Sequence, residues 1–193
     1  MKKIPTLFKR VFEDNKLITT LPIVTEGLED VLHNGVATVK WDGACCAVID
    51  GVFYKRYDAK HGKPIPQGAI KCQEEADTIT GHLPCWVACN RGNPGDKWFW
   101  SAYDKALEQN GVETLKDGTY EAVGRHFNGN PYKMTDDTLK PHGVDIVVVN
   151  RTFEGIMAFL RNNAIEGIVF WLNGEPRAKI KRTDFGFSWN ERS

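Results

Sequence analysis

The spacing of apolar residues along this chain predicts a few helices among many short strands. In the clearest case, apolar residues recur at i, i+3, i+4 and i+7 and form one stripe, at Phe153, Ile156, Met157 and Leu160. We therefore predict a helix over Thr152–Asn163, with Thr152 as its N-cap. A second, shorter helix is predicted over Ala102–Asn110, ending near Gly111.

Short runs rich in β-branched and aromatic residues predict strands. These runs are Val36–Lys40, Cys45–Ile49, Val52–Tyr57, Trp86–Asn90, Trp98–Ser101, Thr119–Val123, Val144–Val149, Ile168–Leu172 and Arg177–Ile180. Asp50-Gly51 and Asn173-Gly174 suit two-residue turns, so each predicts a hairpin. Asp58–Gly81 is polar and rich in Gly, Pro and Lys, which indicates a long loop. The predicted fold class is α+β with antiparallel sheets, and 193 residues suit one domain over residues 1–193.

Composition is that of an ordinary globular protein, with 41% hydrophobic and 26% charged residues. No run of about 18 apolar residues occurs, so we expect no membrane span and no membrane partner. Charged residues interrupt the N-terminal region, which is therefore not a secretory signal. Five cysteines are an odd number, and Cys45 and Cys46 are adjacent, which favours free thiols in a reducing, cytoplasmic setting.

A zinc site is an alternative use of the cysteines, with His82, Cys85 and Cys89 as ligands and Cys72 as a fourth. Their spacing is not that of a standard zinc module, and no second paired-cysteine motif accompanies them. We therefore favour buried thiols.

The formal net charge is zero, which argues against a uniformly basic surface that binds long nucleic acids. Local basic clusters are present nonetheless. One cluster comprises Lys55, Arg56, Lys60, His61 and Lys63, and the other comprises Lys179, Lys181 and Arg182. Each can bind phosphates or form a solvated face.

Lys40-Trp41-Asp42-Gly43 carries the Lys-x-Asp-Gly pattern of enzymes that attach a nucleotide covalently to a lysine. Alone, the pattern also describes a surface lysine before an Asp-Gly turn. Three further motifs follow in the order that such an enzyme needs: Tyr120-Glu121-Ala122-Val123-Gly124, Glu166-Gly167-Ile168-Val169 and Lys179-Ile180-Lys181. Together they favour nucleotide chemistry.

Formation of a lysine–nucleotide bond requires a neutral amine, although a free lysine, with a pKa of about 10.4, is protonated at pH 7. Nearby cations and partial burial lower such a pKa. Lys179 and Lys181 alternate along a predicted strand and share one face, where they can neutralise phosphate oxygens and depress the pKa of Lys40. The alternative is an exposed strand edge, where lysines are common.

Two carboxylates complete the set. Glu166 opens an otherwise apolar strand, and it either binds Mg²⁺ beside a triphosphate or is a turn residue. Glu121 lies among apolar neighbours within a strand and needs a partner, either a ribose hydroxyl or an arginine such as Arg125.

These motifs resemble those of the covalent nucleotidyltransferase superfamily of polynucleotide ligases and mRNA capping enzymes. Four segments resemble more narrowly the small ATP-dependent RNA ligase family that includes the vertebrate 5′-to-3′ RNA ligase: Lys40 to Cys46, Gly81 to Val87, Tyr120 to Tyr132 and Pro141 to Gly143. The resemblance runs from about Val36 to the C-terminus. It implies an antiparallel-sheet nucleotidyltransferase domain, the ATP-grasp-like adenylation domain of ligases.

By this resemblance Lys40 is the adenylated nucleophile. The implied ATP contacts are Val39, Lys40, Arg56, Glu121, Glu166, Lys179 and Lys181. The neighbouring Lys55 is an alternative to Arg56 for this contact. Glu166 also serves the metal, Mg²⁺, for which Mn²⁺ can substitute. The resemblance also implies that Asn128 and Asn130 contact RNA with 5′-phosphate and 3′-hydroxyl ends. We expect Lys60 and Lys63 to contact the RNA as well, because they belong to the basic cluster that adjoins Arg56 in sequence. The resemblance identifies no residue that stacks on adenine.

The chain ends 12 residues after Lys181, where capping enzymes and most DNA ligases of the superfamily carry an OB-fold domain. We therefore expect no OB-fold domain here. The sequence favours a minimal ATP-dependent RNA ligase. The alternatives are a capping-type RNA guanylyltransferase and a non-catalytic module that binds RNA ends.

Overall fold

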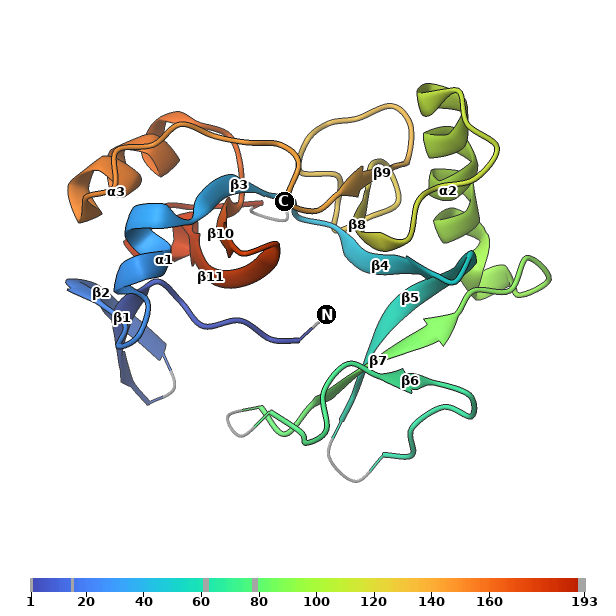
Figure 1. Cartoon of the computed structure of the whole chain (residues 1–193), viewed down its shortest axis with the longest axis horizontal. Helices are drawn as coiled ribbons and strands as arrows, with labels where there is room; N and C mark the ends of the chain where they lie inside the picture. Colours follow the sequence, from blue (N-terminus) through green and yellow to red (C-terminus); the bar gives the residue numbers. More distant parts are fainter. Residues whose placement is uncertain (1, 15, 61–62, 78–79, 191–193) are drawn as a thin grey trace. The chain divides into compact units, whose positions relative to one another are not determined.

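A computed structural model describes residues 2–14, 16–60, 63–77 and 80–190, and the chain forms two compact units (Figure 1). Unit 1 comprises Asp42–Pro141 and the first three residues, and unit 2 comprises Ile4–Trp41 and the chain from His142 onward. The boundary between Trp41 and Asp42 falls within the Lys-x-Asp-Gly motif. Every pairing between the described strands is antiparallel, which confirms the predicted α+β class.

The main sheet of unit 2 has the strand order β11-β10-β3. Its strands are β3 (Val36–Lys40), β10 (Gly167–Leu172) and β11 (Glu175–Lys181). The hairpin between β10 and β11 confirms the prediction, with Asn173 and Gly174 at φ 55° and 78° in its turn. Such positive φ angles suit asparagine and glycine.

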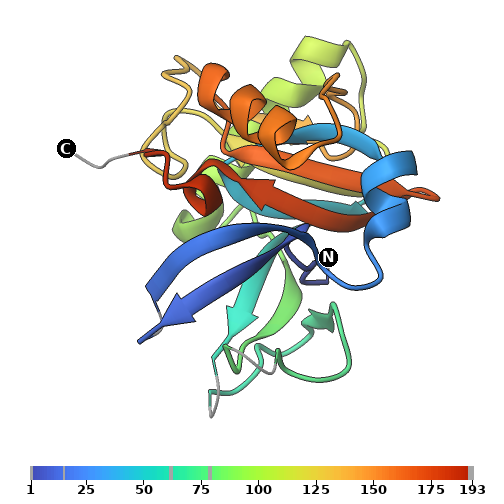
Figure 2. The ribbon, with the colours of Figure 1, turned by 90° about the vertical axis from the view of Figure 1, so that its left-hand side faces the viewer.

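Two helices of unit 2, α1 (Glu29–Asn34) and α3 (Phe153–Asn162), contribute to its core. Figure 2 shows α3 lying along β10 and β11. The predicted N-cap is confirmed, because Oγ1 of Thr152 accepts a hydrogen bond from the N–H of Gly155 at 3.0 Å. The core joins helix residues to alternate strand residues, among them Val31, Leu32, Ile156, Leu160, Ile168, Phe170 and Ile180. The intervening strand residues therefore face the opposite side of the sheet.

A further hairpin of unit 2, which the sequence pattern did not predict, joins β1 (Phe8–Glu13) and β2 (Lys16–Val24). Oγ1 of Thr20 donates to the carbonyl of Asp184 at 2.5 Å, within the short helix η2 (Arg182–Phe185). This hydrogen bond ties the hairpin to the short helix that follows β11.

The N-terminal segment pairs with the outer edge of β11. The N–H of Leu7 donates to the carbonyl of Lys179 at 2.8 Å, and the N–H of Lys179 donates to the carbonyl of Pro5 at 3.0 Å. The alternative of an exposed strand edge for the last lysine motif is therefore wrong at Lys179.

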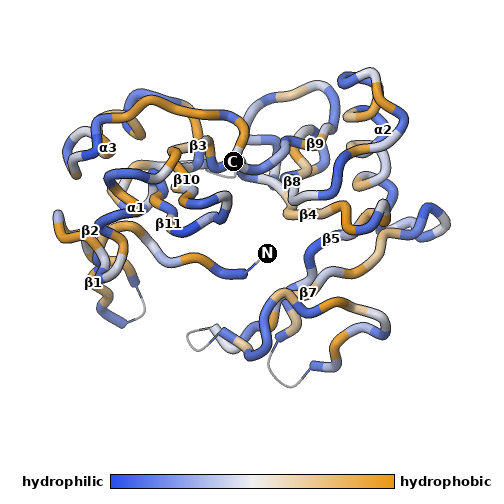
Figure 3. The backbone as a smooth tube through the Cα atoms, in the orientation of Figure 1, coloured by the Kyte–Doolittle hydropathy of each residue, from blue (hydrophilic) through white to orange (hydrophobic). Residues whose placement is uncertain are grey.

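Unit 1 is built on a six-stranded sheet of order β6-β7-β5-β4-β8-β9. Its strands are β4 (Ala44–Ile49), β5 (Val52–Ala59), β6 (Ile70–Lys71), β7 (Leu83–Ala88), β8 (Gly118–Val123) and β9 (Thr138–Pro141). The β4–β5 hairpin is confirmed, with Asp50 and Gly51 at φ 50° and 73°. Figure 3 shows β4 as hydrophobic along its length and the middle of β5 as hydrophilic.

The helix α2 (Lys97–Asn110), after the short helix η1 (Pro94–Asp96), packs on this sheet and corrects one prediction. Trp98–Ser101 is not a strand but the first turn of α2. Aromatic residues favour strands locally, yet packing against the sheet uses an i, i+3, i+4, i+7 stripe of Phe99, Ala102, Tyr103 and Ala106. The helix ends at Gly111, as predicted, with φ 62°.

Three other predictions differ in extent. The strand predicted over Trp86–Asn90 is β7, which begins three residues earlier, and the predicted long loop contains β6 because Ile70 pairs with Trp86. The strand predicted over Val144–Val149 is wrong as a full strand. This segment meets β3 only at one bridge, Ile146 with Thr38, and through two backbone hydrogen bonds. No helix among the described residues is long and apolar enough to cross a membrane.

Candidate active site

Lys40 is the last residue of β3, and its register partner on β10 is Gly167. Glu166 directly precedes β10, which brings its carboxylate beside the lysine. The Lys40 ammonium donates to Oε2 of Glu166, and Nζ of Lys181 lies 2.6 Å from Oε1. Glu166 is only 6% exposed, and a buried carboxylate needs such partners. Three residues from separate sequence motifs thus form one charged cluster in unit 2.

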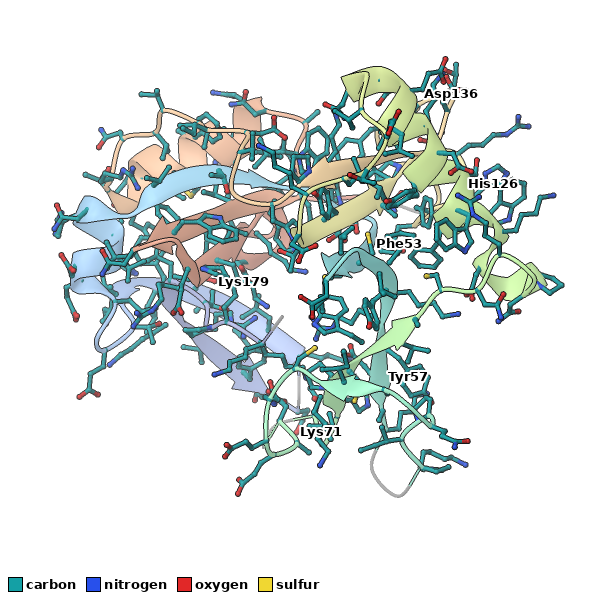
Figure 4. The ribbon with its side chains drawn as sticks, turned by 45° about the vertical axis from the view of Figure 1, so that its right-hand side comes forward. Phe53, Tyr57, Lys71, His126, Asp136 and Lys179 are labelled. Atoms are coloured by element: carbon teal, nitrogen blue, oxygen red, sulfur yellow. The ribbon has the colours of Figure 1, made fainter. Side chains whose placement is uncertain are left out.

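Lys179 lies on the same face of this sheet, because it pairs in register with Val169, two residues along from the Lys181–Gly167 pair. Burial, and then the charges of Lys181 and Lys40, lower the pKa of Lys179 to about 8. No hydrogen-bonding or ion-pair partner of the side-chain amine of Lys179, labelled in Figure 4, lies among the described residues. An anion beside this amine would compensate its charge and restore its pKa.

The side chain of Val39 lies on the other face of the sheet. Val39 pairs with Ile168, whose side chain is in the core, so both point away from the lysine face. Its N–H donates to the carbonyl of Asp145 at 2.8 Å. Only the backbone of Val39 therefore accompanies the lysine cluster.

An apolar surface lies next to the lysine cluster on the same face. Ile146 and Val169 flank Thr38 on its two sides, and the indole N–H of Trp171 donates to Oγ1 of Thr38 at 3.0 Å. Ile146 is 67% exposed, although isoleucine is among the residues most often buried. We name Ile146, Val169 and Trp171 the apolar shelf, and it can accept a planar ring such as a nucleobase. The sequence signal for it was the run of β-branched residues around Ile146, over Val144–Val149.

In unit 1, Arg56 and Glu121 lie in one row across the six-stranded sheet. Cys45 pairs with Glu121, and the β4–β5 register places Arg56 on its other side. Lys140 pairs with Glu121 and continues the row. Burial first, and Glu121 second, raise the pKa of Cys45 to about 12, so the central thiol of the row is neutral at pH 7. The two predicted nucleotide contacts of unit 1 therefore share one face.

The structure separates Arg56 from its neighbour Lys55. The Lys55 ammonium donates to Asp96, which is 1% exposed and also accepts from the N–H of Asn90 at 2.9 Å. Nε of Arg56 bonds to Asp58 at 2.9 Å on the opposite face. Since only Arg56 shares the row with Glu121, it is the better candidate for a nucleotide contact.

Asn128 and Asn130 lie in the loop after β8, and their side chains bond to the protein itself. Nδ2 of Asn128 donates to Oδ1 of Asp42 at 2.8 Å and to the carbonyl of Gly43 at 2.7 Å. The amide of Asn130 donates to the carbonyl of Met134 and accepts from its N–H, both at 2.8 Å. These contacts link the loop to the Lys-x-Asp-Gly motif and to itself.

The remaining basic residues differ in whether their side chains are exposed or bonded to the protein. Lys60 and Lys63 are exposed, and the N–H of Lys63 donates to the carbonyl of Lys60 at 3.0 Å, whereas His61 lies outside the described residues. Arg182 bonds to carbonyls at the end of α3, including that of Asn163 at 2.8 Å. Arg182 therefore stabilises the fold, and Lys60 and Lys63 are available to a ligand.

The cysteines behave as free thiols. All five are unpaired, as expected. Within the described part of the chain, His82, Cys72, Cys85 and Cys89 do not gather as three or more ligand atoms at metal-binding distances. The zinc alternative gains no support from this arrangement.

Comparisons with known proteins relate the chain to one group. No family profile matches it. The protein named RNA ligase 1 of Mus musculus is 24% identical over 94% of this chain and 76% of its own length. The protein of the same name from Danio rerio is 23% identical over 97% of this chain and 82% of its own length. These similarities support an RNA ligase family relationship, as the sequence motifs predicted.

The mouse alignment runs over 248 positions, more than the 193 residues of this chain. The relative therefore contains insertions that this chain lacks.

Proposed function

We propose that this chain is an ATP-dependent RNA ligase that joins 5′-phosphate and 3′-hydroxyl RNA ends through a lysyl-AMP intermediate. The observation that carries the proposal is the cluster of Lys40, Glu166 and Lys181, with Lys179 on the same face of the sheet. The family relationship to proteins named RNA ligase 1 supports RNA as the substrate class.

In the first proposed step, Nζ of Lys40 attacks the α-phosphorus of ATP. A nitrogen–phosphorus bond forms, and the bond to pyrophosphate breaks. The Lys40 ammonium must first lose a proton, and Glu166 is placed to take it because it already accepts a hydrogen bond from this group. Lys179 and Lys181 then stabilise the negative charge on the phosphate oxygens.

Glu166 is also the proposed contact for Mg²⁺, or for Mn²⁺ in its place. Each of its oxygens accepts from an ammonium here, so the residue would fit a metal ion once Lys40 has left Oε2 and the proton taken from Lys40 has passed to water. A single carboxylate with substrate phosphates is an ordinary Mg²⁺ ligand set. When bound, the ion would neutralise phosphate charge.

The proposed nucleotide contacts follow the chemistry of each surface. The apolar shelf of unit 2 suits adenine, because Ile146 and its neighbours offer exposed apolar area beside Lys40. In unit 1, Glu121 suits a ribose hydroxyl and Arg56 a phosphate or ribose oxygen.

Two transfers complete the proposed reaction. AMP passes from Lys40 to the RNA 5′-phosphate, which regenerates the amine and forms a phosphoanhydride. The RNA 3′-hydroxyl then attacks the 5′-phosphorus, so that a phosphodiester forms and AMP leaves. Lys60 and Lys63 are the proposed contacts for RNA phosphates, because both are exposed.

The test combines nucleotide choice with sealing. The protein is incubated with Mg²⁺ and ATP, GTP or neither, and its intact mass is measured before nicked RNA is added. We expect addition of AMP from ATP and sealing of 5′-phosphorylated RNA. Addition of GMP would favour the capping-type guanylyltransferase, and no addition with retained RNA-end binding would favour the non-catalytic module.

A further inference from the structure

The loop after β8 has a use that the proposed reaction does not assign. We propose that this loop, Gly124–Asp137, is a clamp on the turn that follows the nucleophile, and that Asn128 and Tyr132 are positioning residues for Lys40. The inference rests on the proposed function only in taking Lys40 as the residue that reacts.

The clamp bonds to consecutive backbone groups of the motif. The hydroxyl of Tyr132 accepts from the N–H of Asp42 at 2.7 Å, and Asn128 donates to Oδ1 of Asp42 and to the carbonyl of Gly43. Oε1 of Glu121 accepts from the N–H of Gly43 at 3.1 Å. Side chains thus hold the Asp-Gly turn, which lies two residues from Lys40 and lacks strand pairing of its own.

Gly43 also has no space to move toward β8. A Cβ at this position would lie 2.1 Å from the carbonyl oxygen of Ala122. The turn is therefore pressed against β8 on one side and bonded by the loop. These contacts restrict movement of the turn.

The loop itself contains several residues in the left-handed backbone region, which is uncommon for residues other than glycine. Asn128, Gly129, Asn130 and Lys133 all have positive φ, between 44° and 73°. Each non-glycine residue in this region costs about 1 kcal/mol or more, so the conformation persists only where its surroundings fix it. Strained segments of this kind are concentrated at functional sites.

Contacts at the two ends of the loop hold this backbone conformation in place. The N–H of His126 donates to Oδ1 of Asp137 at 3.0 Å, and its Nδ1 lies 2.7 Å from Oδ2. His126, labelled in Figure 4, stacks on Trp98 of α2 with ring centroids 3.4 Å apart. Phe127 is 5% exposed within the core of unit 1. The loop is thus anchored on both sides of Asn128.

A rigid turn matters because Lys40 is joined to it through Trp41 alone. Displacement of a reacting group by about 1 Å can slow a reaction about 100-fold. The predicted RNA contact is the rival assignment for Asn128, but its Nδ2 already donates twice to the motif. The two assignments differ in which step they affect.

The test uses Asn128→Gly and Tyr132→Phe, since glycine keeps the positive φ and phenylalanine removes only the hydroxyl. Asn173→Gly, at φ 55° in the β10–β11 turn, and Tyr57→Phe are matched controls. Single-turnover AMP addition is followed by intact mass, without RNA, over a range of ATP concentrations. We expect the maximal rate to fall about 10- to 100-fold in both clamp variants, with the half-saturating ATP concentration within about twofold of wild type.

A second readout needs no nucleotide. Hydrogen–deuterium exchange of the peptide containing Asp42 and Gly43 should become faster in both clamp variants and stay unchanged in the controls. Unchanged exchange would overturn the clamp. Normal adenylation with slower RNA sealing alone would also overturn it and assign Asn128 to RNA. If the wild-type protein takes up no AMP while exchange responds as expected, the clamp stands and the proposed function fails.

Discussion

Lys40 forms an ion pair with Glu166, although 126 positions separate them in the chain. The pairing of β3 with β10 brings the two together, and Lys181 occupies the other oxygen of the same carboxylate. In this state the side-chain nitrogen of the proposed nucleophile is paired with the carboxylate of Glu166. Proton loss from Lys40 and departure from Glu166 are therefore coupled events.

Replacement of Glu166 should affect both activity and stability. In Glu166→Gln, two ammonium groups lose their partner, and we expect the free energy of unfolding to fall by about 1–3 kcal/mol. Adenylation should slow at least about 100-fold, since the amine loses its proton acceptor. Urea unfolding and AMP addition are the measurements, with the exposed Glu175→Gln on β11 as the control. Wild-type adenylation in Glu166→Gln would remove this residue from the reaction.

Lys179→Met should separate stability from activity. Because the pKa of Lys179 is lowered to about 8 in the folded protein, the unfolded chain holds this proton more tightly. Below pH 8 the folded state therefore bears the full free-energy cost of keeping this buried amine charged. This cost disappears as the pH rises from 8 toward 10.5. We expect Lys179→Met to raise stability at pH 7, with a smaller gain at pH 9.5, and to slow adenylation about 100-fold. Lys9→Met, on exposed β1, is the control for both assays; equal stability gains at the two pH values would contradict this account.

ATP should make Lys179 take up a proton. An anion beside the amine raises its pKa from about 8, so binding near pH 8 transfers protons from the buffer. Calorimetry in two buffers of different ionisation enthalpy, with Lys40→Arg to prevent reaction, measures this uptake. We expect uptake at pH 8, less at pH 6.5, and a smaller effect in Lys179→Met. Identical heats in both buffers at pH 8 would place the phosphates elsewhere.

The motif residues were predictable because their chemistry is local, whereas their partners were not. Spacing alone predicted that Lys179 and Lys181 share a face, and the register confirms it. The choice between Arg56 and Lys55 required the neighbouring strands, since only cross-strand pairing shows which face joins Glu121. The contact between Asn128 and Asp42 depends on a loop conformation that no short pattern encodes.

Elements with one dominant period were predicted best. The helix α3 and both tight-turn hairpins are confirmed, because stripe spacing and Asp-Gly or Asn-Gly turns act locally. The first turn of α2 was predicted as a strand because its aromatic content outweighed its spacing. The β1–β2 hairpin was missed, since its apolar residues Val11, Phe12 and Ile18 are exposed and give no clear pattern.

Lys55→Ala and Arg56→Ala should give opposite results despite their adjacency. Lys55→Ala leaves the buried carboxylate of Asp96 without its cation, so we expect a loss of roughly 2–4 kcal/mol in unfolding free energy. Arg56→Ala should change stability little and impair nucleotide transfer at least about tenfold. Thermal melting and AMP addition, measured side by side, separate the two. A reversal of these effects would show that the face assignment is wrong.

Lys60→Ala combined with Lys63→Ala should act on RNA binding. Each removes an exposed cation that the account assigns to RNA phosphates, so binding should weaken and its dependence on salt should flatten by up to about two units of slope. Binding of 5′-phosphorylated RNA is measured across a salt series. A wild-type slope in the double variant would locate the RNA contacts elsewhere.

The central claim is that Lys40 carries AMP. The most direct measurement is peptide mapping by mass spectrometry after incubation with ATP and Mg²⁺, on the wild-type chain and on Lys40→Arg. We predict one AMP on the peptide that contains Lys40 and none on any peptide of Lys40→Arg, because guanidinium stays protonated and cannot attack. AMP on Lys179 or Lys181, or AMP that persists in Lys40→Arg, would contradict the account.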